Sequence, residues 1–149
     1  MKTAVYAGTF DPITNGHLDI ALRAACLFDH IIVAVALDNY KDNLFSIEER
    51  CAMVRCAVRD CPNIEVDSFE GLLVDYCKRR GATSIIRGLR AVSDFDMEFQ
   101  MALLNRELNG GIDTVFLMSD AKYLYISSSL IRQSAELGGN IRDMVPPCV

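Results

Sequence analysis

Residues Ala7 to His17 read AGTFDPITNGH and lie between a short apolar run and a longer run with helical spacing. The run before them, TAVY at Thr3–Tyr6, is rich in β-branched and aromatic residues and predicts a strand. Apolar residues recur at helical spacing from Leu18 to Leu27 and predict a helix. The segment between them is therefore a strand-to-helix turn. In an open parallel sheet such turns lie at the carboxyl edge, where ligands bind.

A phosphate site is expected at this turn. The N-terminus of the following helix directs free backbone N–H groups and the positive end of its dipole toward that edge. Thr9 offers a hydroxyl and His17 an imidazole to the same place. The alternative for His17 is a residue that only caps or packs the first helical turn. The turn matches neither a Walker A sequence nor a G-x-G-x-x-G fingerprint.

Length and composition indicate one globular domain over residues 1–149. The chain is 51% hydrophobic and 23% charged, which excludes a disordered protein. Its net charge of −5 argues against a nucleic-acid partner, because a protein that coats nucleic acid needs a basic face. A small anionic ligand needs only a local cluster of arginine and lysine.

The termini and the cysteines predict a cytoplasmic protein without a membrane partner. Met1-Lys2-Thr3 leads directly into the first strand, without a secretory signal. No apolar run approaches the ~20 residues of a membrane helix. The cysteines form no C-x-x-C pair, so we expect reduced thiols, mostly small core hydrophobes, and no metal or disulfide framework. The six cysteines are Cys26, Cys51, Cys56, Cys61, Cys77 and Cys148.

Five runs of strand length alternate with five helical patterns along the chain. The strands are expected at 3–6, 30–37, 64–69, 83–87 and 114–118, and the helices at 18–27, 46–59, 71–80, 93–108 and 128–137. Short loops join them, without internal repeats or low-complexity linkers. This alternation predicts the α/β class: a Rossmann-like, five-stranded parallel sheet with helices on both faces.

Basic residues follow two of the expected strands at the carboxyl edge. Lys41 follows the second strand, where the alternative is a solvated loop charge. Arg87 and Arg90 flank Gly88 after the fourth strand. Arginine forms bidentate bonds to phosphate oxygens, and glycine lets the backbone approach a ligand. The alternative for this arginine pair is a set of surface salt bridges.

Polar residues of two later helices complete the candidate site. Glu98 could accept hydrogen bonds from ribose hydroxyls or hold a neighbouring arginine in place. Ser127, Ser128 and Ser129 stand at a helix start, where their hydroxyls and backbone N–H groups form a donor set of the size of a triphosphate. Helix capping alone is the alternative explanation of such a serine-rich start.

Four segments together resemble the nucleotidyltransferases with a T/H-x-G-H signature, and most closely the bacterial phosphopantetheine adenylyltransferases. The segments are GTFDPITNGH at 8–17, FSIEER at 45–50, RGLRAVSDF at 87–95 and ISSS at 126–129. The resemblance runs from Ala4 to about Val145, and its RGLR segment is specific to this branch. It implies transfer of AMP from ATP to 4′-phosphopantetheine, which gives dephospho-coenzyme A and pyrophosphate in the penultimate step of coenzyme A synthesis.

The resemblance also implies which residues contact each substrate. Around phosphopantetheine it places Thr9, Lys41, Leu73, Arg87, Met101 and Asn105. Around ATP it places Thr9, Phe10, His17, Gly88, Arg90, Glu98, Tyr123, Leu124, Tyr125, Ile126, Ser127, Ser128 and Ser129.

The implied reaction is a direct in-line attack without a covalent enzyme intermediate, because the phosphate of the substrate is already a nucleophile. Catalysis then consists of positioning two anions and stabilising the transferring group. His17 would stabilise the transition state by donating to an α-phosphate oxygen. Lys41 and Arg87 would neutralise the incoming phosphate, Thr9 would orient its oxygen, and Arg90 would hold the leaving phosphates.

The resemblance further implies Mg²⁺ as the cofactor, a homohexamer, and coenzyme A as a feedback ligand. Mg²⁺ would bridge phosphate oxygens with few protein ligands, so no protein metal site is predicted. The chain ends at Val149, earlier than many members of the family, which leaves its assembly open. Two alternatives remain: an adenylyl- or cytidylyltransferase for nicotinamide mononucleotide or a polyol phosphate, and a non-catalytic nucleotide sensor.

Overall fold

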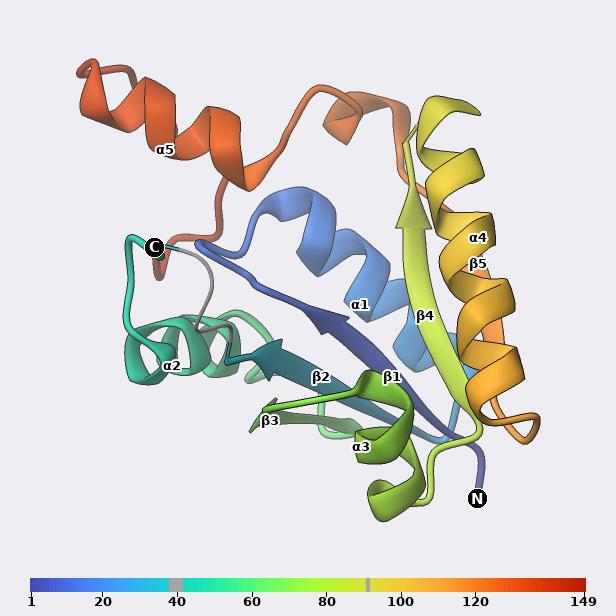
Figure 1. Ribbon diagram of the computed structural model, residues 1–149. Coiled ribbons are helices and arrows are strands. Elements are labelled where there is room, and N and C mark those ends of the chain that lie inside the picture. Colours follow the sequence, from blue (N-terminus) through green and yellow to red (C-terminus); the bar gives the residue numbers. More distant parts are fainter. Residues whose placement is uncertain (38–41, 91) are drawn as a thin grey trace.

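The chain folds around a parallel β-sheet whose strand order is β3-β2-β1-β4-β5 (Figure 1). The computed structural model describes residues 1–37, 42–90 and 92–149, without the side chains of 92–94. Within these residues the five strands are β1 (Thr3–Gly8), β2 (His30–Ala36), β3 (Ile64–Phe69), β4 (Ser84–Leu89) and β5 (Asp113–Met118). All four neighbouring pairs are parallel, so the predicted sheet is confirmed.

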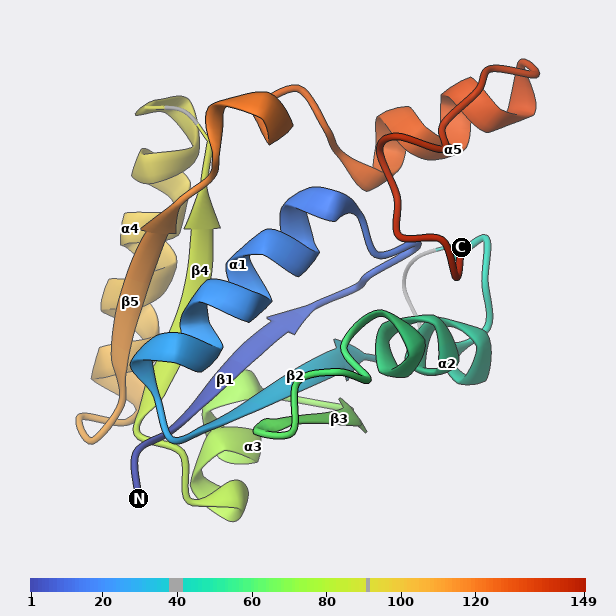
Figure 2. The ribbon, with the colours of Figure 1, turned by 180° about the vertical axis from the view of Figure 1, so that it is seen from behind.

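Helices cover both faces of the sheet, as expected. The helices α1 (Asn15–Leu27) and α2 (Ile47–Ala57) lie on one face, and α3 (Leu73–Arg80) and α4 (Val92–Leu108) lie on the other (Figures 1 and 2). The short 3₁₀ helix η1 (Ala121–Tyr123) and the helix α5 (Ser128–Glu136) lie beyond the carboxyl ends of β4 and β1. No helix in the described ranges combines the length and apolar character that a bilayer crossing requires.

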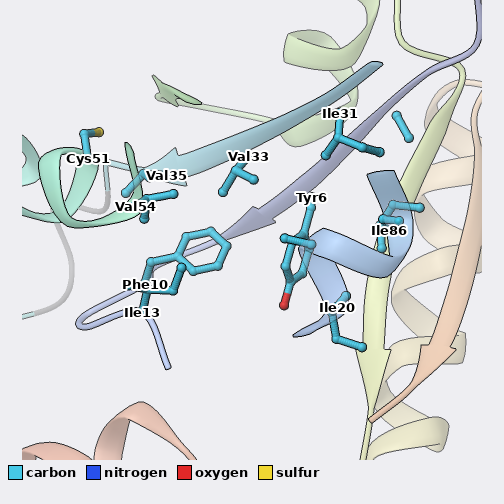
Figure 3. Packing of buried hydrophobic residues seen from close by; sticks show 13 residues of the cluster. Tyr6, Phe10, Ile13, Ile20, Ile31, Val33, Val35, Cys51, Val54 and Ile86 are labelled. Carbon is cyan, nitrogen blue, oxygen red and sulfur yellow. The ribbon is translucent and has the colours of Figure 1, made fainter. Parts of the chain in front are cut away.

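Alternate residues of the central strands form two apolar layers. On β1, Tyr6 packs toward α1 and α2, whereas Val5 packs toward α3. Figure 3 shows the first layer, in which Tyr6 of β1 lies between Val33 of β2 and Ile86 of β4. Burial on both faces explains why β2 is a continuous apolar run instead of an alternating one.

The predicted start of α2 is confirmed in detail. The Ser46 hydroxyl accepts a hydrogen bond from the Glu49 N–H at 3.1 Å, and the Glu49 carboxylate accepts one from the Ser46 N–H at 3.2 Å. This reciprocal capping box satisfies backbone donors that the first helical turn leaves unpaired. The strand β4 continues to Leu89, beyond its expected end, and there Arg87 and Gly88 pair with β5.

One expectation about the cysteines is wrong, because Cys56 of α2 and Cys148 form a disulfide. The two residues are separated by 92 positions, so no local spacing signals the pair. The C-terminal segment returns to the N-terminus of α1, where the Asn15 N–H donates to the Met144 carbonyl at 2.9 Å. This return brings the two Cα atoms to 6.2 Å, within disulfide reach. The prediction of buried thiols holds for Cys51 and Cys77, while Cys26 is exposed and Cys61 is half-buried.

We expect the variant Cys148→Ser to unfold at a lower temperature than the wild type in the absence of a reductant. A crosslink that closes so long a loop stabilises a protein by roughly 2–4 kcal/mol, and for a chain of this size the loss corresponds to roughly 5–10 °C. Calorimetry of both proteins measures the difference. Cys26→Ser, which removes an exposed thiol outside the disulfide, is the control. Equal unfolding temperatures for Cys148→Ser and the wild type would contradict the prediction.

Candidate active site

A cavity of about 470 Å³ opens at the carboxyl edge of the sheet, between the turn after β1, the start of α1, the end of β4 and the segment that leads into α5. It gathers most of the residues that were expected around a nucleotide. These are Thr9, Phe10, His17, Gly88, Arg90, Glu98, Tyr123, Ile126, Ser127 and Ser128. Its volume lies within the range of cavities that hold small ligands.

A second cavity of about 100 Å³ lies beside α4. It collects the remaining described residues that were expected around phosphopantetheine, namely Leu73, Arg87, Met101 and Asn105. Arg87 and Glu98 line both cavities. The two predicted substrate sites therefore adjoin each other, with these two side chains between them.

Three of the predicted residues that the structure describes line neither cavity. Leu124 and Tyr125 are exposed, and line neither cavity. Ser129 also lines neither, and its hydroxyl accepts a hydrogen bond from Arg132 at 3.4 Å. Lys41 lies outside the described residues, so its role stays a prediction.

The ring of His17 is fixed by the N-cap of its own helix. The backbone N–H of Thr14 donates to Nδ1 of His17 at 3.0 Å, and the Thr14 hydroxyl lies 3.2 Å from the same nitrogen. In return, the Thr14 hydroxyl accepts a hydrogen bond from the His17 N–H at 3.3 Å. Because Nδ1 is an acceptor, the proton of the neutral ring is on Nε2. His17 is thus both a cap and a donor for the cavity that it lines.

Electrostatics keep this imidazole neutral. Burial lowers the pKa of His17 from 6.5 to about 4, and the nearby charges of Arg90 and Arg87 contribute in the same direction. The ring of Phe10 packs edge-on against the imidazole with a centroid separation of 5.0 Å. At neutral pH the site therefore holds a neutral N–H donor between two guanidinium groups.

The lowered pKa of His17 predicts a pH-dependent stability. Between pH 6.5 and 4 the unfolded chain binds a proton at His17 that the folded chain does not bind, so the free energy of unfolding falls as the pH falls through this window. We expect roughly 1–2 kcal/mol of loss from this group between pH 7 and pH 5. Urea unfolding of the wild type and of His17→Gln at several pH values measures it, because glutamine does not titrate and keeps the capping box. The same pH slope in both proteins would contradict the prediction.

Arg87 is held by a carboxylate of the facing helix. Its Nε and Nη2 donate to the two carboxylate oxygens of Glu98 at 2.8 and 2.7 Å, and its Nη1 donates to the Ala7 carbonyl at 3.2 Å. This pairing raises the pKa of Arg87. Of the two roles considered for Glu98, the structure shows the arginine partner. With side-chain exposures of 36% for Arg87 and 17% for Glu98, this is a half-buried ion pair.

The segment before α5 makes structural hydrogen bonds and also lines the larger cavity. Ser127 caps α5, because its hydroxyl accepts from the Leu130 N–H at 3.2 Å. Ser128 donates to the Pro12 carbonyl at 2.8 Å, and Arg90 donates to the Ile126 carbonyl at 3.1 Å. The capping explanation is therefore correct for Ser127. The serines still place the N-terminus of α5 at the cavity, as an anion site requires.

Gly88 lines the larger cavity and also lies against α1. A Cβ atom at this position would lie 3.3 Å from the Ile20 side chain of α1, so the glycine permits close packing of α1 on β4.

Sequence reasoning missed several residues of the cavity and its walls. Thr14 could have been found from its place as N-cap three residues before His17. Ser119, which also lines the cavity, directly follows β5, a position at the carboxyl edge. The buried pair Asp11 and Arg50 behind the cavity carries no local signal, because its partners are distant in sequence.

Comparisons with known proteins find relatives over nearly the whole chain. Residues 5–134 match the cytidylyltransferase-like family. The chain is 58% identical over 147 residues to the phosphopantetheine adenylyltransferase of Moorella thermoacetica, an alignment that covers 99% of this chain and 92% of the relative. It is 53% identical to the phosphopantetheine adenylyltransferase of Desulfatibacillum aliphaticivorans, with coverage of 99% and 85%.

A solved structure shares the fold. It is described as a nicotinate-nucleotide adenylyltransferase from Vibrio parahaemolyticus, and it superimposes with a TM-score of 0.72 at 17% identity. The superposition covers 99% of this chain and 95% of that chain. At this identity the likeness supports the architecture alone.

Proposed function

The chain belongs to the phosphopantetheine adenylyltransferases, within the cytidylyltransferase-like family, and from this membership we infer that it transfers AMP from ATP to 4′-phosphopantetheine. The products are dephospho-coenzyme A and pyrophosphate, and the reaction is the penultimate step of coenzyme A synthesis. The family predicted from the sequence motifs is confirmed. One observation supports the assignment most directly: two adjoining cavities meet at Arg87 and Glu98.

We propose that ATP occupies the larger cavity and phosphopantetheine the smaller one. The phosphate of phosphopantetheine then reaches the α-phosphate of ATP beside Arg87, which lines both cavities. This phosphate is ionised at neutral pH and attacks in line, so the reaction needs neither a protein base nor a covalent intermediate. The guanidinium of Arg87 lowers the repulsion between the two anions.

His17 is the proposed stabiliser of the transition state. Its Nε2–H donates to a non-bridging oxygen of the α-phosphate, where charge develops during transfer. The Thr14 N–H keeps Nδ1 as the acceptor, so the donor is preorganised before substrate arrives. Thr9 and Lys41 orient the incoming phosphate, while Arg90 and the N-terminus of α5 hold the β- and γ-phosphates that leave.

Mg²⁺ is proposed as a partner of ATP and not as a resident metal of the protein. Glu98, the carboxylate that lines both cavities, has both oxygens on Arg87. Mg²⁺ usually keeps several waters and takes substrate phosphates as ligands, so it fits a site without a cluster of carboxylates. When bound, Mg²⁺ would neutralise negative charge on the phosphates of ATP.

A homohexamer is proposed for the assembly, supported by the surface of α4. Several of its large apolar side chains are exposed, among them Met97 at 71% and Leu103 at 52%. An apolar helix surface of this kind is typical of subunit contacts. Light scattering of the wild type and of Met97→Glu tests the proposal, and a monomeric wild type would contradict it.

Coenzyme A is proposed as a feedback ligand, because it joins a pantetheine arm to an adenine nucleotide and can occupy both cavities. Equal initial rates with and without coenzyme A, at subsaturating substrates, would exclude this. The enzyme is proposed to work in the cytoplasm, where its substrate ATP is available.

Release of pyrophosphate from ATP and Mg²⁺, with and without 4′-phosphopantetheine, tests the reaction. We expect release only with the acceptor. Release with nicotinamide mononucleotide or a polyol phosphate instead would assign the chain to a related transferase. ATP binding without turnover on any acceptor would indicate a nucleotide sensor.

A further inference from the structure

Two charged side chains are fully buried behind the larger cavity without lining it. Arg50 of α2 and Asp11 of the turn after β1 are each 1% exposed. A buried charge is costly unless hydrogen bonds compensate for the lost water, so such residues are retained where their bonds matter. The mechanism described above uses neither residue.

The guanidinium of Arg50 joins the carboxyl ends of two neighbouring strands. Its Nη1 donates to the Thr9 carbonyl at 2.8 Å and to the Ala36 carbonyl at 3.0 Å. Its Nε donates to the Phe45 carbonyl at 3.2 Å. Thr9 directly follows β1, and Ala36 is the last residue of β2. The side chain of Arg50 therefore links the ends of β1 and β2 to each other and to the segment that leads into α2.

Asp11 also binds the segment that leads into α2. Its carboxylate accepts hydrogen bonds from the N–H groups of Leu44 and Phe45 at 2.8 and 2.9 Å. Arg132 of α5 lies 3.7 Å from this carboxylate and donates to the Asp11 carbonyl at 2.6 Å. The peptide groups of Phe45 are thus held at both ends: the N–H by Asp11 and the carbonyl by Arg50.

Between these two anchors lies a residue with unusual backbone geometry. Phe10 has a φ of 50°, in the left-handed region that side-chain-bearing residues rarely adopt. Such a conformation persists only where the surrounding structure determines it. Here Arg50 donates to the carbonyl of the preceding residue, Thr9. The following residue, Asp11, is held by the bonds of its carboxylate to the Leu44 and Phe45 N–H groups and by the bond from Arg132 to its carbonyl. The outcome is the contact between the rings of Phe10 and His17.

We propose that Arg50 and Asp11 are positioning residues for adenylyl transfer, which hold Thr9 and Phe10 in the geometry that aligns His17 with the reacting phosphate. The proposal rests on the proposed function. Both residues act on the turn that carries Thr9, and Asp11 also contacts Arg132 of α5. Replacing either residue leaves Arg90 and the serines at the start of α5 in place. Their loss should therefore lower kcat far more than the affinity for ATP.

Steady-state kinetics of Arg50→Lys, Arg50→Met and Asp11→Asn test the proposal. A misplacement of about 1 Å at a reacting group costs on the order of 10²-fold in rate. We expect kcat to fall about 10- to 100-fold in Arg50→Met and Asp11→Asn, with less loss in Arg50→Lys. The KM for ATP should change by less than about threefold, because the groups proposed to hold the triphosphate are untouched.

The matched control is Arg55→Met, which removes an exposed arginine from the same helix and should leave kcat unchanged. Circular dichroism and calorimetric ATP binding accompany each variant. Folded variants that bind ATP and turn over at the wild-type rate would overturn the proposal. A loss of kcat that follows the loss of ATP binding or of folded protein would also overturn it, since it would show a purely structural role. A wild type without turnover on phosphopantetheine would instead contradict the proposed function.

Discussion

Replacement of His17 by alanine is expected to lower kcat by on the order of 10²–10³-fold or more, with ATP binding largely retained. The imidazole contributes a neutral Nε2–H donor whose partner gains charge only during the transfer, so its loss affects the transition state more than the ground state. Pyrophosphate release gives the rate, and calorimetry gives the affinity for ATP.

Two controls separate catalysis from helix capping. Thr14→Ala removes the hydroxyl that caps α1 but leaves the imidazole, and its stability cost is about 1 kcal/mol. It should retain most of the activity. His30→Ala replaces the other histidine, which pairs with Glu65 on β3 and lines neither cavity. If Thr14→Ala lost as much activity as His17→Ala, the cap and not the donor would explain the effect.

Replacement of Arg87 by methionine is expected to raise the KM for phosphopantetheine by about 10- to 100-fold and to lower kcat. The variant removes the cation that lies between the two cavities and leaves the carboxylate of Glu98 without its bidentate partner. A charge-assisted bond of this kind contributes about 1.5–3 kcal/mol, which corresponds to roughly 10- to 150-fold and so covers that range. Arg87→Lys should show nearly the same changes in KM and kcat as Arg87→Met, because an ammonium group cannot form two parallel bonds.

Arg106→Met is the matched control for Arg87→Met. Arg106 is also an arginine paired with a carboxylate, but its side chain is 69% exposed and lies 3.9 Å from Asp113. We expect wild-type kinetics for it. An unchanged KM for phosphopantetheine in Arg87→Met would contradict the proposed place of the acceptor phosphate.

Glu98→Gln distinguishes the two roles considered for Glu98. If Glu98 acts through Arg87, the variant should affect the KM for phosphopantetheine in the same direction as Arg87→Met. If Glu98 binds the ribose of ATP, the KM for ATP should rise instead. The bidentate contact to Arg87 favours the first result.

The sheet, its helices and part of the larger cavity followed from local patterns, whereas residues such as Tyr123 and Met101 followed only from the family resemblance. A continuous apolar run such as β2 marks a strand that is covered on both faces, and Ser46 with Glu49 marks a helix start. Because parallel strands place their following turns at one edge, residues as distant as Thr9 and Ser128 could be assigned to one site before any contact was known. The strand and helix-start patterns depend on residues close together in the chain. The assignment of distant residues to one site depends on the topology of a parallel sheet.

Side-chain partnerships could be decided only by the packing of distant elements. The disulfide between Cys56 and Cys148 depends on the return of the C-terminal segment to α2. Glu98 meets Arg87 because α4 packs on β4, and Arg50 reaches the Thr9 carbonyl because α2 packs on β2, the neighbour of β1. Residue type and spacing show that such groups are available for pairing. Which group each one meets depends on distances that exist only once helices and strands have packed together.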